Sequence, residues 1–264
     1  MLNAIFERYD IFLFVFVRIT GFIVFNPVLG RRNVPVMTRG ALAFVLSLTA
    51  LMAITSNPEV DALQTADFGH MLMFGIYIIK EFVFGYLMGL VVNLFYMIVV
   101  VGGEMMDLQI GLAMSQLFDP ASNVQMPLMG NFLNFAFMLM FFLTNAHITL
   151  VGILFMSFQI SPVGIMAFNP EVGLYLMKIF AEIFIMCLKL AFPIIVAELM
   201  MEVGVGLLMR AVPQINIFVV GLQMKILAGI SVMIICAPVS VWFFDDVISR
   251  MNQVAWEALR VLAQ

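Results

Sequence analysis

Six long apolar blocks restrict this chain to one kind of fold. Several reach or exceed the roughly 18–20 apolar residues that a helix needs to cross a bilayer. Lipid offers the backbone no hydrogen-bond partners, so such blocks fold as helices. Only 11% of the 264 residues are charged and 64% are hydrophobic, so we expect an all-α, multi-helix membrane protein forming a single domain, residues 1–264. The blocks are Ile11–Leu29, Gly40–Thr55, Met71–Val101, Leu128–Phe158, Leu174–Met209 and Ile215–Phe244.

Three of these blocks are long for one crossing. At 1.5 Å per residue the third reaches about 45 Å, against about 30 Å of hydrocarbon. Pro193 divides the fifth block and predicts a kink there, and the sixth block contains Pro238. The tail 245–264 differs, because its apolar residues form one stripe typical of an amphipathic helix. The stripe comprises Ile248, Met251, Ala255, Leu259 and Leu262.

The two ends of the sequence give conflicting signals about orientation. The start, MLNAIFERYD, lacks the basic region of a cleaved signal, so we expect it to be retained. Arginines 31, 32 and 39 predict that the first turn lies in the cytoplasm. If the chain crosses the membrane six times, Arg250 and Arg260 near the other end favour the opposite orientation. The conflict indicates that the blocks are not all simple crossings.

The sequence gives little support for catalysis, metal binding or nucleic-acid binding. The net charge of −4 is too small for a nucleic-acid surface. Cys187 and Cys236 lie inside apolar blocks, where buried structural thiols are expected. His70 and His147 are isolated, which favours interior histidines over metal ligands. We therefore expect neither an enzyme nor a cofactor.

Charged residues inside the apolar blocks are costly, so they indicate a bundle interior or a partner. Glu198 and Glu202 share one helical face and repel each other unless a cation lies opposite. One alternative is a proton relay with Lys189, as in a proton-coupled small-solute transporter. The other is an assembly surface completed by a cation from another helix or subunit, which the scatter of the charges favours. The remaining charges are Arg18, Lys80, Glu81, Glu104, Asp107, Lys178, Glu182 and Lys225.

Two local patterns concern packing. Gly85 and Gly89 form a G-x-x-x-G pattern that predicts the close approach of a neighbouring helix. The chain also contains 24 methionines, and Met105, Met106 and Met129 are among those that lie in or beside the stretch described next. Methionine fills irregular gaps, so a deformable seal is one interpretation beside a general abundance of methionine.

The stretch GEMMDLQIGLAMSQLFDPASNVQMP, residues 103–127, interrupts the apolar pattern. Gly111 permits an unusual dihedral angle, and Asp119-Pro120 favours a break in the helix. A broken helix at membrane depth is tolerated where it lines a cavity or is wrapped in protein. The stretch is therefore either a loop that projects bulky groups into an enclosed space or an ordinary connector. The bulky groups are Leu112, Met114, Leu117 and Phe118.

This stretch resembles the central signature of the FliR/SctT export-gate family of type III secretion, and of its flagellar branch in particular. Two other segments agree, GRRNVPVMTR near the first block and MRAVPQINIFVVGLQMKILAGI before and into the sixth. The resemblance covers essentially the whole chain. Leu222-Gln223 departs from the Phe-Pro that is common in the family, which leaves a kink near Gly221 in question.

The resemblance implies a subunit of a flagellar protein export gate, built of long kinked helical hairpins in a hetero-oligomeric helical assembly. The implied partners are FliP, FliQ, FlhB, the basal-body ring and the unfolded flagellar proteins that are exported. The implied location is the bacterial inner membrane, extending to the periplasmic side. By the same resemblance the segment 111–126 is a plug, anchored at its base by Glu104 and Asp107. Its expected members are Gly111, Leu112, Met114, Leu117, Phe118, Asp119 and Pro120. An assembly or salt-bridge role is expected for Glu104, Asp107, Lys178, Glu182, Lys189, Glu198 and Glu202.

Overall fold

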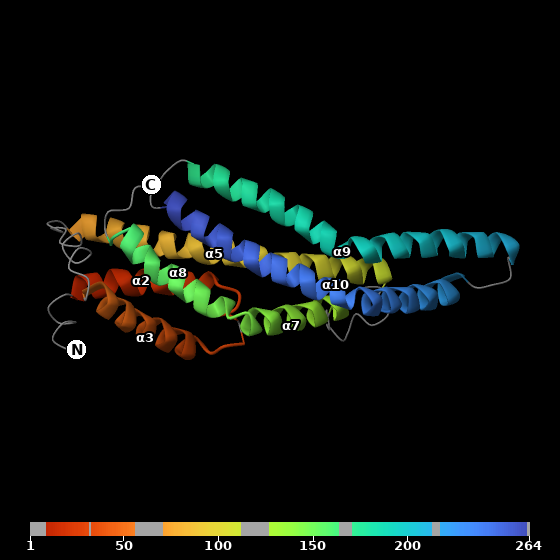
Figure 1. The fold of residues 1–264 in the computed structure, drawn as a ribbon, viewed down its shortest axis with the longest axis horizontal. Helices are drawn as coiled ribbons and strands as arrows, with labels where there is room; N and C mark the ends of the chain where they lie inside the picture. Colours follow the sequence, from red (N-terminus) through yellow and green to blue (C-terminus); the bar gives the residue numbers. More distant parts are fainter. Residues whose placement is uncertain are drawn as a thin grey trace. The chain divides into compact units, whose positions relative to one another are not determined.

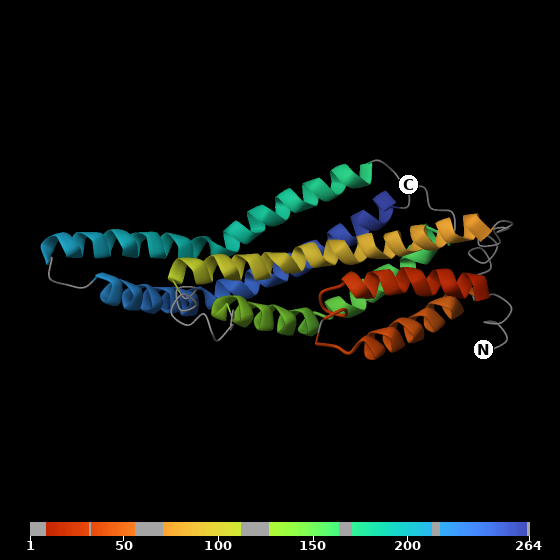
Figure 2. The ribbon, with the colours of Figure 1, turned by 180° about the vertical axis from the view of Figure 1, so that it is seen from behind.

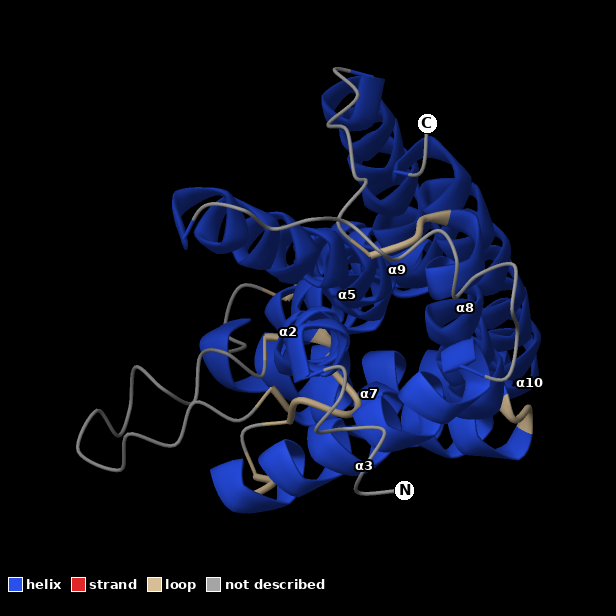
Figure 3. Cartoon of the chain, turned by 90° about the vertical axis from the view of Figure 1, so that its left-hand side faces the viewer, coloured by secondary structure: helices blue, strands red, loops and turns tan. Residues whose placement is uncertain are grey.

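Helices account for all the regular structure in the described part of the chain. The computed structural model describes residues 9–31, 33–55, 71–111, 127–163, 171–212 and 217–262. Figure 3 shows helices joined by loops, without a strand in these ranges. The predicted all-α class is confirmed. The helices are α2 (Tyr9–Phe25), α3 (Val36–Thr55), α5 (Met71–Ile110), α7 (Leu128–Leu143), α8 (Ala146–Ile160), α9 (Glu171–Ala211) and α10 (Ile217–Leu262).

Four of these helices are long and apolar enough to cross a membrane, namely α3, α5, α9 and α10. The bent pair α7 and α8 is a fifth candidate if the two form one span. The helix α2 has 17 residues. The six apolar blocks are thus helical as predicted, while the number of single-helix candidates is smaller.

The ends of α2 and α3 differ from the prediction for a local reason. The helix α2 stops at Phe25, four residues early, because Asn26-Pro27 begins a turn. The Asn26 side-chain oxygen accepts hydrogen bonds from the N–H groups of Val28 (2.9 Å) and Leu29 (3.1 Å). This asparagine turn competes with the helix. The helix α3 begins directly after Pro35, so part of the predicted basic turn is helical.

The predicted ends of three further blocks were wrong. The helix α5 continues past Val101 through both Glu104 and Asp107. The fourth block is interrupted at Thr144-Asn145, where Asn145 takes a left-handed conformation with a φ of 56°. Asparagine tolerates this conformation better than most residues, so it separates α7 from α8. The tail 245–264 is not a separate helix, because α10 runs on to Leu262.

Both helix-interior prolines are accommodated within one element. The helix α9 is continuous through Pro193, and α10 is continuous through Pro238. The prolines therefore do not end their helices. The predicted apolar stripe of the tail is confirmed, since Met251, Ala255 and Leu259 are all buried.

The chain divides into two compact units, Met1–Leu94 with Asn145–Ile179 and Ser249–Gln264, and Phe95–Thr144 with Phe180–Ile248. In the first unit, α2 and α3 lie side by side (Figures 1 and 2). In the second, the later part of α9 and the first part of α10 form a long hairpin (Figure 1). The expectation of one domain stays a prediction.

A glycine contact joins α2 to α5 in the first unit. A Cβ on Gly85 would overlap the Arg18 carbonyl oxygen, and one on Gly89 would lie 2.8 Å from the Phe22 carbonyl oxygen. The predicted close approach at Gly85 and Gly89 is therefore confirmed, and its partner is α2. Gly21 on α2 takes part as well, because its Cβ would lie 2.6 Å from the Phe82 carbonyl oxygen.

Candidate functional site

The predicted plug falls almost wholly outside the described residues. This applies to Leu112, Met114, Leu117, Phe118, Asp119 and Pro120. Gly111 is described and has a φ of 84°, which bears out the expected unusual dihedral angle. Its N–H donates to the Leu108 carbonyl oxygen at 3.3 Å, as the final turn of α5 closes. What the structure defines is how the chain leaves α5 and how it enters α7.

The end of α5 is fixed by contact with α10. Ile110 is fully buried. A Cβ on Gly229 of α10 would lie 2.5 Å from Cγ1 of Ile110, so the isoleucine fills the space that the glycine leaves open. The chain therefore departs from α5 at a packed position, immediately before Gly111.

The start of α7 is held by a buried carboxylate of α5. The Asp107 side chain accepts hydrogen bonds from the N–H groups of Met129 (Oδ1, 3.0 Å) and Gly130 (Oδ2, 3.0 Å). Pro127, at the N-cap position, supplies no side-chain cap. Asp107 thus caps α7 from another helix, where a carboxylate also interacts favourably with the helix dipole.

Glycines allow the approach that this cap requires. A Cβ on Gly103 of α5 would overlap Cα of Gly130 on α7. On the adjoining side, a Cβ on Gly102 would lie 2.9 Å from a methyl group of Leu190 on α9. The Gly102-Gly103 pair therefore brings α5 against two helices at once.

Sequence reasoning proposed Glu104 and Asp107 as joint anchors, and the structure treats them differently. Asp107 is 4% exposed and bonded to backbone N–H groups. Glu104 is exposed, and no hydrogen bond to it occurs among the described residues. Asp107 has the contacts of an anchor for the start of α7, whereas an anchoring role for Glu104 stays a prediction.

The cation opposite the two glutamates of α9 comes from the same chain. Lys225 of α10 forms an ion pair with Glu202, and both side chains are partly exposed. Glu198, one turn earlier on α9, is fully buried. Neither of its carboxylate oxygens has a hydrogen-bond partner in the part of the chain that is described. Lys225 is therefore bonded to Glu202, the more exposed of the two acids.

The other charges of α9 have no defined role in this structure. Lys178 and Lys189 are exposed, and Glu182 is half-buried. The assembly role expected for these residues stays a prediction. Cys187 is buried as expected, whereas Cys236 is only partly buried, and both thiols are free.

Sequence reasoning missed the pairing of Arg18 with Glu81. Nε of the fully buried Arg18 on α2 donates to Oε2 of Glu81 on α5 at 2.5 Å. Its Nη1 donates to the carbonyl oxygens of Ser157 (3.2 Å) and Ser161 (3.0 Å). The guanidinium also lies over the ring of Phe158 at 4.6 Å. The partners are 63 or more residues apart, so the only signal was one cation and one acid in neighbouring apolar blocks.

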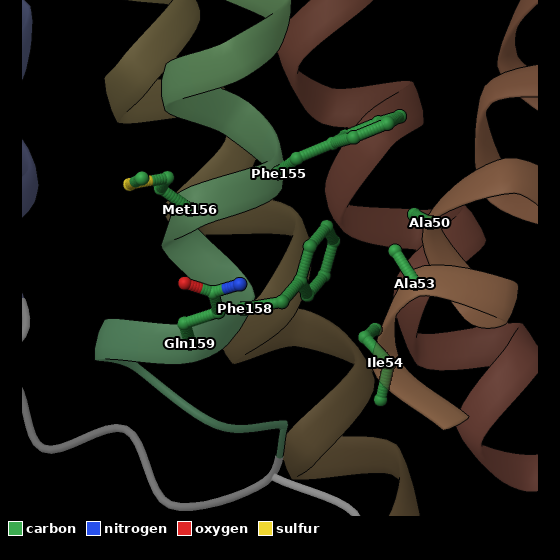
Figure 4. A pocket seen from close by; sticks show the side chains of 7 residues that line it. All are labelled: Ala50, Ala53, Ile54, Phe155, Met156, Phe158 and Gln159. Carbon is green, nitrogen blue, oxygen red and sulfur yellow. The ribbon is translucent and has the colours of Figure 1, made fainter. Parts of the chain in front are cut away.

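The described pockets are apolar. One, of about 180 Å³, lies between α3 and α8; in Figure 4 the Phe158 ring points toward Ala53 and Ile54 across it. A more open cleft of about 450 Å³ between α7 and α10 includes Phe132 and Ile234. Neither brings together a nucleophile and a base, and no cluster of potential metal ligands occurs in the described ranges. These surfaces suit apolar side chains or lipid chains.

Comparison with known proteins places these observations in context. The model of the family described as bacterial export proteins, family 1, matches residues 9–251. A flagellar biosynthetic protein FliR of Bacillus subtilis is 31% identical over 90% of this chain and 90% of its own length. That of Escherichia coli is 27% identical over 92% and 90%. The Yop proteins translocation protein T of Yersinia pestis is 29% identical over 81% and 80%.

Proposed function

The chain belongs to family 1 of the bacterial export proteins, and from this premise we propose that it is a subunit of a flagellar type III protein export gate. In this proposal it lines a closed channel through which unfolded flagellar proteins leave the cell. The similarity to proteins named for flagellar biosynthesis and for Yop translocation supports a role in type III export.

The observation that carries the proposal is the apolar length of three helices, together with the sparse burial of one of them, α10. The helices α5, α9 and α10 contain 40, 41 and 46 residues. Straight helices of this size measure about 60–70 Å, roughly twice the hydrocarbon thickness of a bilayer. Only 6% of the most apolar window of α10 is buried within the chain. Lipid cannot cover so long a surface, so other protein must, which favours a subunit over a solitary transporter.

We propose that the covering partners are FliP and FliQ, with FlhB and the basal-body ring nearby. The proposed location is the bacterial inner membrane, with the long helices extending to the periplasmic side. The exposed apolar residues of α10, such as Ile234, Ile235 and Trp242, suit helix-to-helix burial against such subunits.

The plug role of segment 111–126 is part of the same proposal. Its support is the way the structure fixes both flanks: Ile110 packed against Gly229, and α7 capped by Asp107. Fixed flanks on both sides are what a channel seal requires. The bulky residues Met114, Leu117 and Phe118 would then block leakage.

Two experiments test the proposal. Co-expression with FliP and FliQ should give a stable complex that survives detergent extraction and gel filtration; failure to co-purify would contradict the gate. Deleting residues 112–125 from the assembled complex should raise ion conductance across liposomes. Unchanged conductance would contradict the plug role while leaving the subunit assignment intact.

A transporter is distinguished by reconstitution of the chain alone. A proton-coupled small-solute transporter moves solute without other subunits, whereas a gate subunit is inert or unstable in isolation. Proton-driven uptake of a small solute by the purified single chain in liposomes would replace the gate proposal.

A further inference from the structure

Glu198 is the one acid of the α9–α10 hairpin that is described as fully buried. Both of its carboxylate oxygens lack a hydrogen-bond partner among the described residues. It lies beside Gly229 of α10 and Ile110 of α5, because a Cβ on Gly229 would lie 3.1 Å from Oε1 of Glu198 and 2.7 Å from Cδ1 of Ile110. The carboxyl group is thus shielded from water and accepts no hydrogen bond from the described part of the chain.

Among the described residues, two charged groups act on this carboxyl group, Lys225 and Glu202. From α10 the facing group is Lys225, which is ion-paired with Glu202. From its own helix the facing group is Glu202, one turn further along. The helix α5 contributes the apolar Ile110, while its own acid Asp107 is engaged with the N–H groups of Met129 and Gly130. Two acids therefore compete for one cation, and the cation is bonded to the exposed one.

The balance of charge decides the state of the remaining acid. One lysine neutralises one carboxylate, which leaves a second negative charge without a bonded cation. Burying an unpaired ionised carboxylate costs far more than the few kcal/mol of a typical folding contact, and proteins usually avoid this cost by binding a proton. The arrangement around Glu198 fits a neutral carboxylic acid, not a carboxylate.

We propose that Glu198 is a proton-binding site, protonated in the arrangement described here. When the proton leaves to water, the carboxylate draws Lys225 away from Glu202, one helical turn along the hairpin. The charge also disfavours the packing of Ile110 beside Gly229, where α5 ends. Protonation of the Glu198 side chain is thereby linked to the packing of the end of α5 against the α9–α10 hairpin. The inference does not depend on the export role.

Infrared difference spectroscopy tests this directly in the full-length protein, purified with its partner subunits. Spectra recorded across a pH titration report the carbonyl stretch of each buried protonated carboxylic acid. We expect a band present at neutral pH that is lost in Glu198→Gln. The band should persist in the control Glu171→Gln, which changes an exposed glutamate at the start of the same helix.

A second variant makes the result independent of how well Glu198→Gln folds. Removing the nearby cation with Lys225→Met should change the pH at which the band is lost, because the lysine charge then no longer acts on the acid. The absence of any Glu198-dependent band at neutral pH would overturn the proposal. If the band of the Lys225→Met variant is lost at the same pH as that of the parent protein, the proposal is also overturned, because the lysine and Glu198 would then not interact.

Discussion

Two charge clusters in this chain follow opposite designs. Around Arg18 there is one buried cation and one buried acid, and the cation also has two carbonyl oxygens and aromatic rings as partners. Around Lys225 there are two acids, of which one is bonded and partly exposed and the other is buried and unbonded. In the first cluster the cation and the acid are bonded to each other. In the second cluster, the unbonded acid Glu198 can bind a proton.

The difference separates a structural charge from a responsive one. The buried Arg18–Glu81 pair is fixed, because every alternative leaves a buried charge without its counter-ion at high cost. The Lys225–Glu202 pair has a second acid, Glu198, one helical turn away, so the lysine has an alternative partner when that acid is ionised. Burial alone therefore does not identify a functional charge, and the number of partners must be counted as well.

The largest expected effect is at the Arg18–Glu81 cluster. Arg18→Met leaves Glu81 buried without its cation, which should destabilise the fold by about 3–5 kcal/mol. Thermal denaturation of the detergent-solubilised protein measures the loss. The double variant Arg18→Met with Glu81→Leu should recover most of it. A single variant as stable as the parent protein would refute the idea that this cluster is structural.

The next effect concerns the packing that brings the pair together. Gly85→Ala places a methyl group against the Arg18 carbonyl oxygen and should cost about 1–3 kcal/mol. Gly75→Ala is the matched control on the same helix, because nothing lies within 4 Å of its added Cβ. The same denaturation assay compares them. Equal stability of the two variants would show that α2 and α5 are not in close contact.

A smaller effect is expected at Asp107, an acid that is satisfied by N–H groups instead of a cation. Asp107→Ala removes both hydrogen bonds to the start of α7 and should cost about 1–2 kcal/mol. Hydrogen exchange of the Met129 and Gly130 amides should become faster, while exchange in α8 stays the same. Unchanged exchange at these two amides would argue against the cap.

The smallest effect on stability belongs to the responsive cluster. The Lys225–Glu202 pair is partly exposed, with side chains 25% and 49% accessible, so Glu202→Gln should change stability by about 0–1 kcal/mol. Denaturation at two salt concentrations provides the check, because screening weakens exposed pairs. A loss as large as that of Arg18→Met would erase the contrast between the clusters.

Hydrophobicity and glycine spacing predicted the fold well. The apolar blocks, the Gly85–Gly89 contact and the buried stripe near Met251 and Leu259 all follow from local pattern, and each was found. Helix ends were less predictable. The break at Asn145 depends on one left-handed residue, and the continuation of α5 past Gly102-Gly103 depends on neighbours that accept the glycines.

The charge clusters show where sequence reasoning stops. Arg18 and Glu81 were recognised as costly charges, but their pairing depends on the crossing of α2 and α5. Glu198 and Glu202 were recognised as one face, because a spacing of four is visible in the sequence. That Lys225 pairs with Glu202 and leaves Glu198 bare requires the register of α9 against α10, which only three-dimensional structure provides.

The sparse burial of α10 has a consequence for the life of the chain in a cell. A newly made copy without partner subunits exposes a long apolar helix surface to the chaperones and proteases of the membrane. The lifetime of that copy then depends on how soon partner subunits bind and cover the exposed surface of α10. Synthesis of the chain in excess would accordingly raise degradation and not the number of finished assemblies, so that quality control sets the copy number.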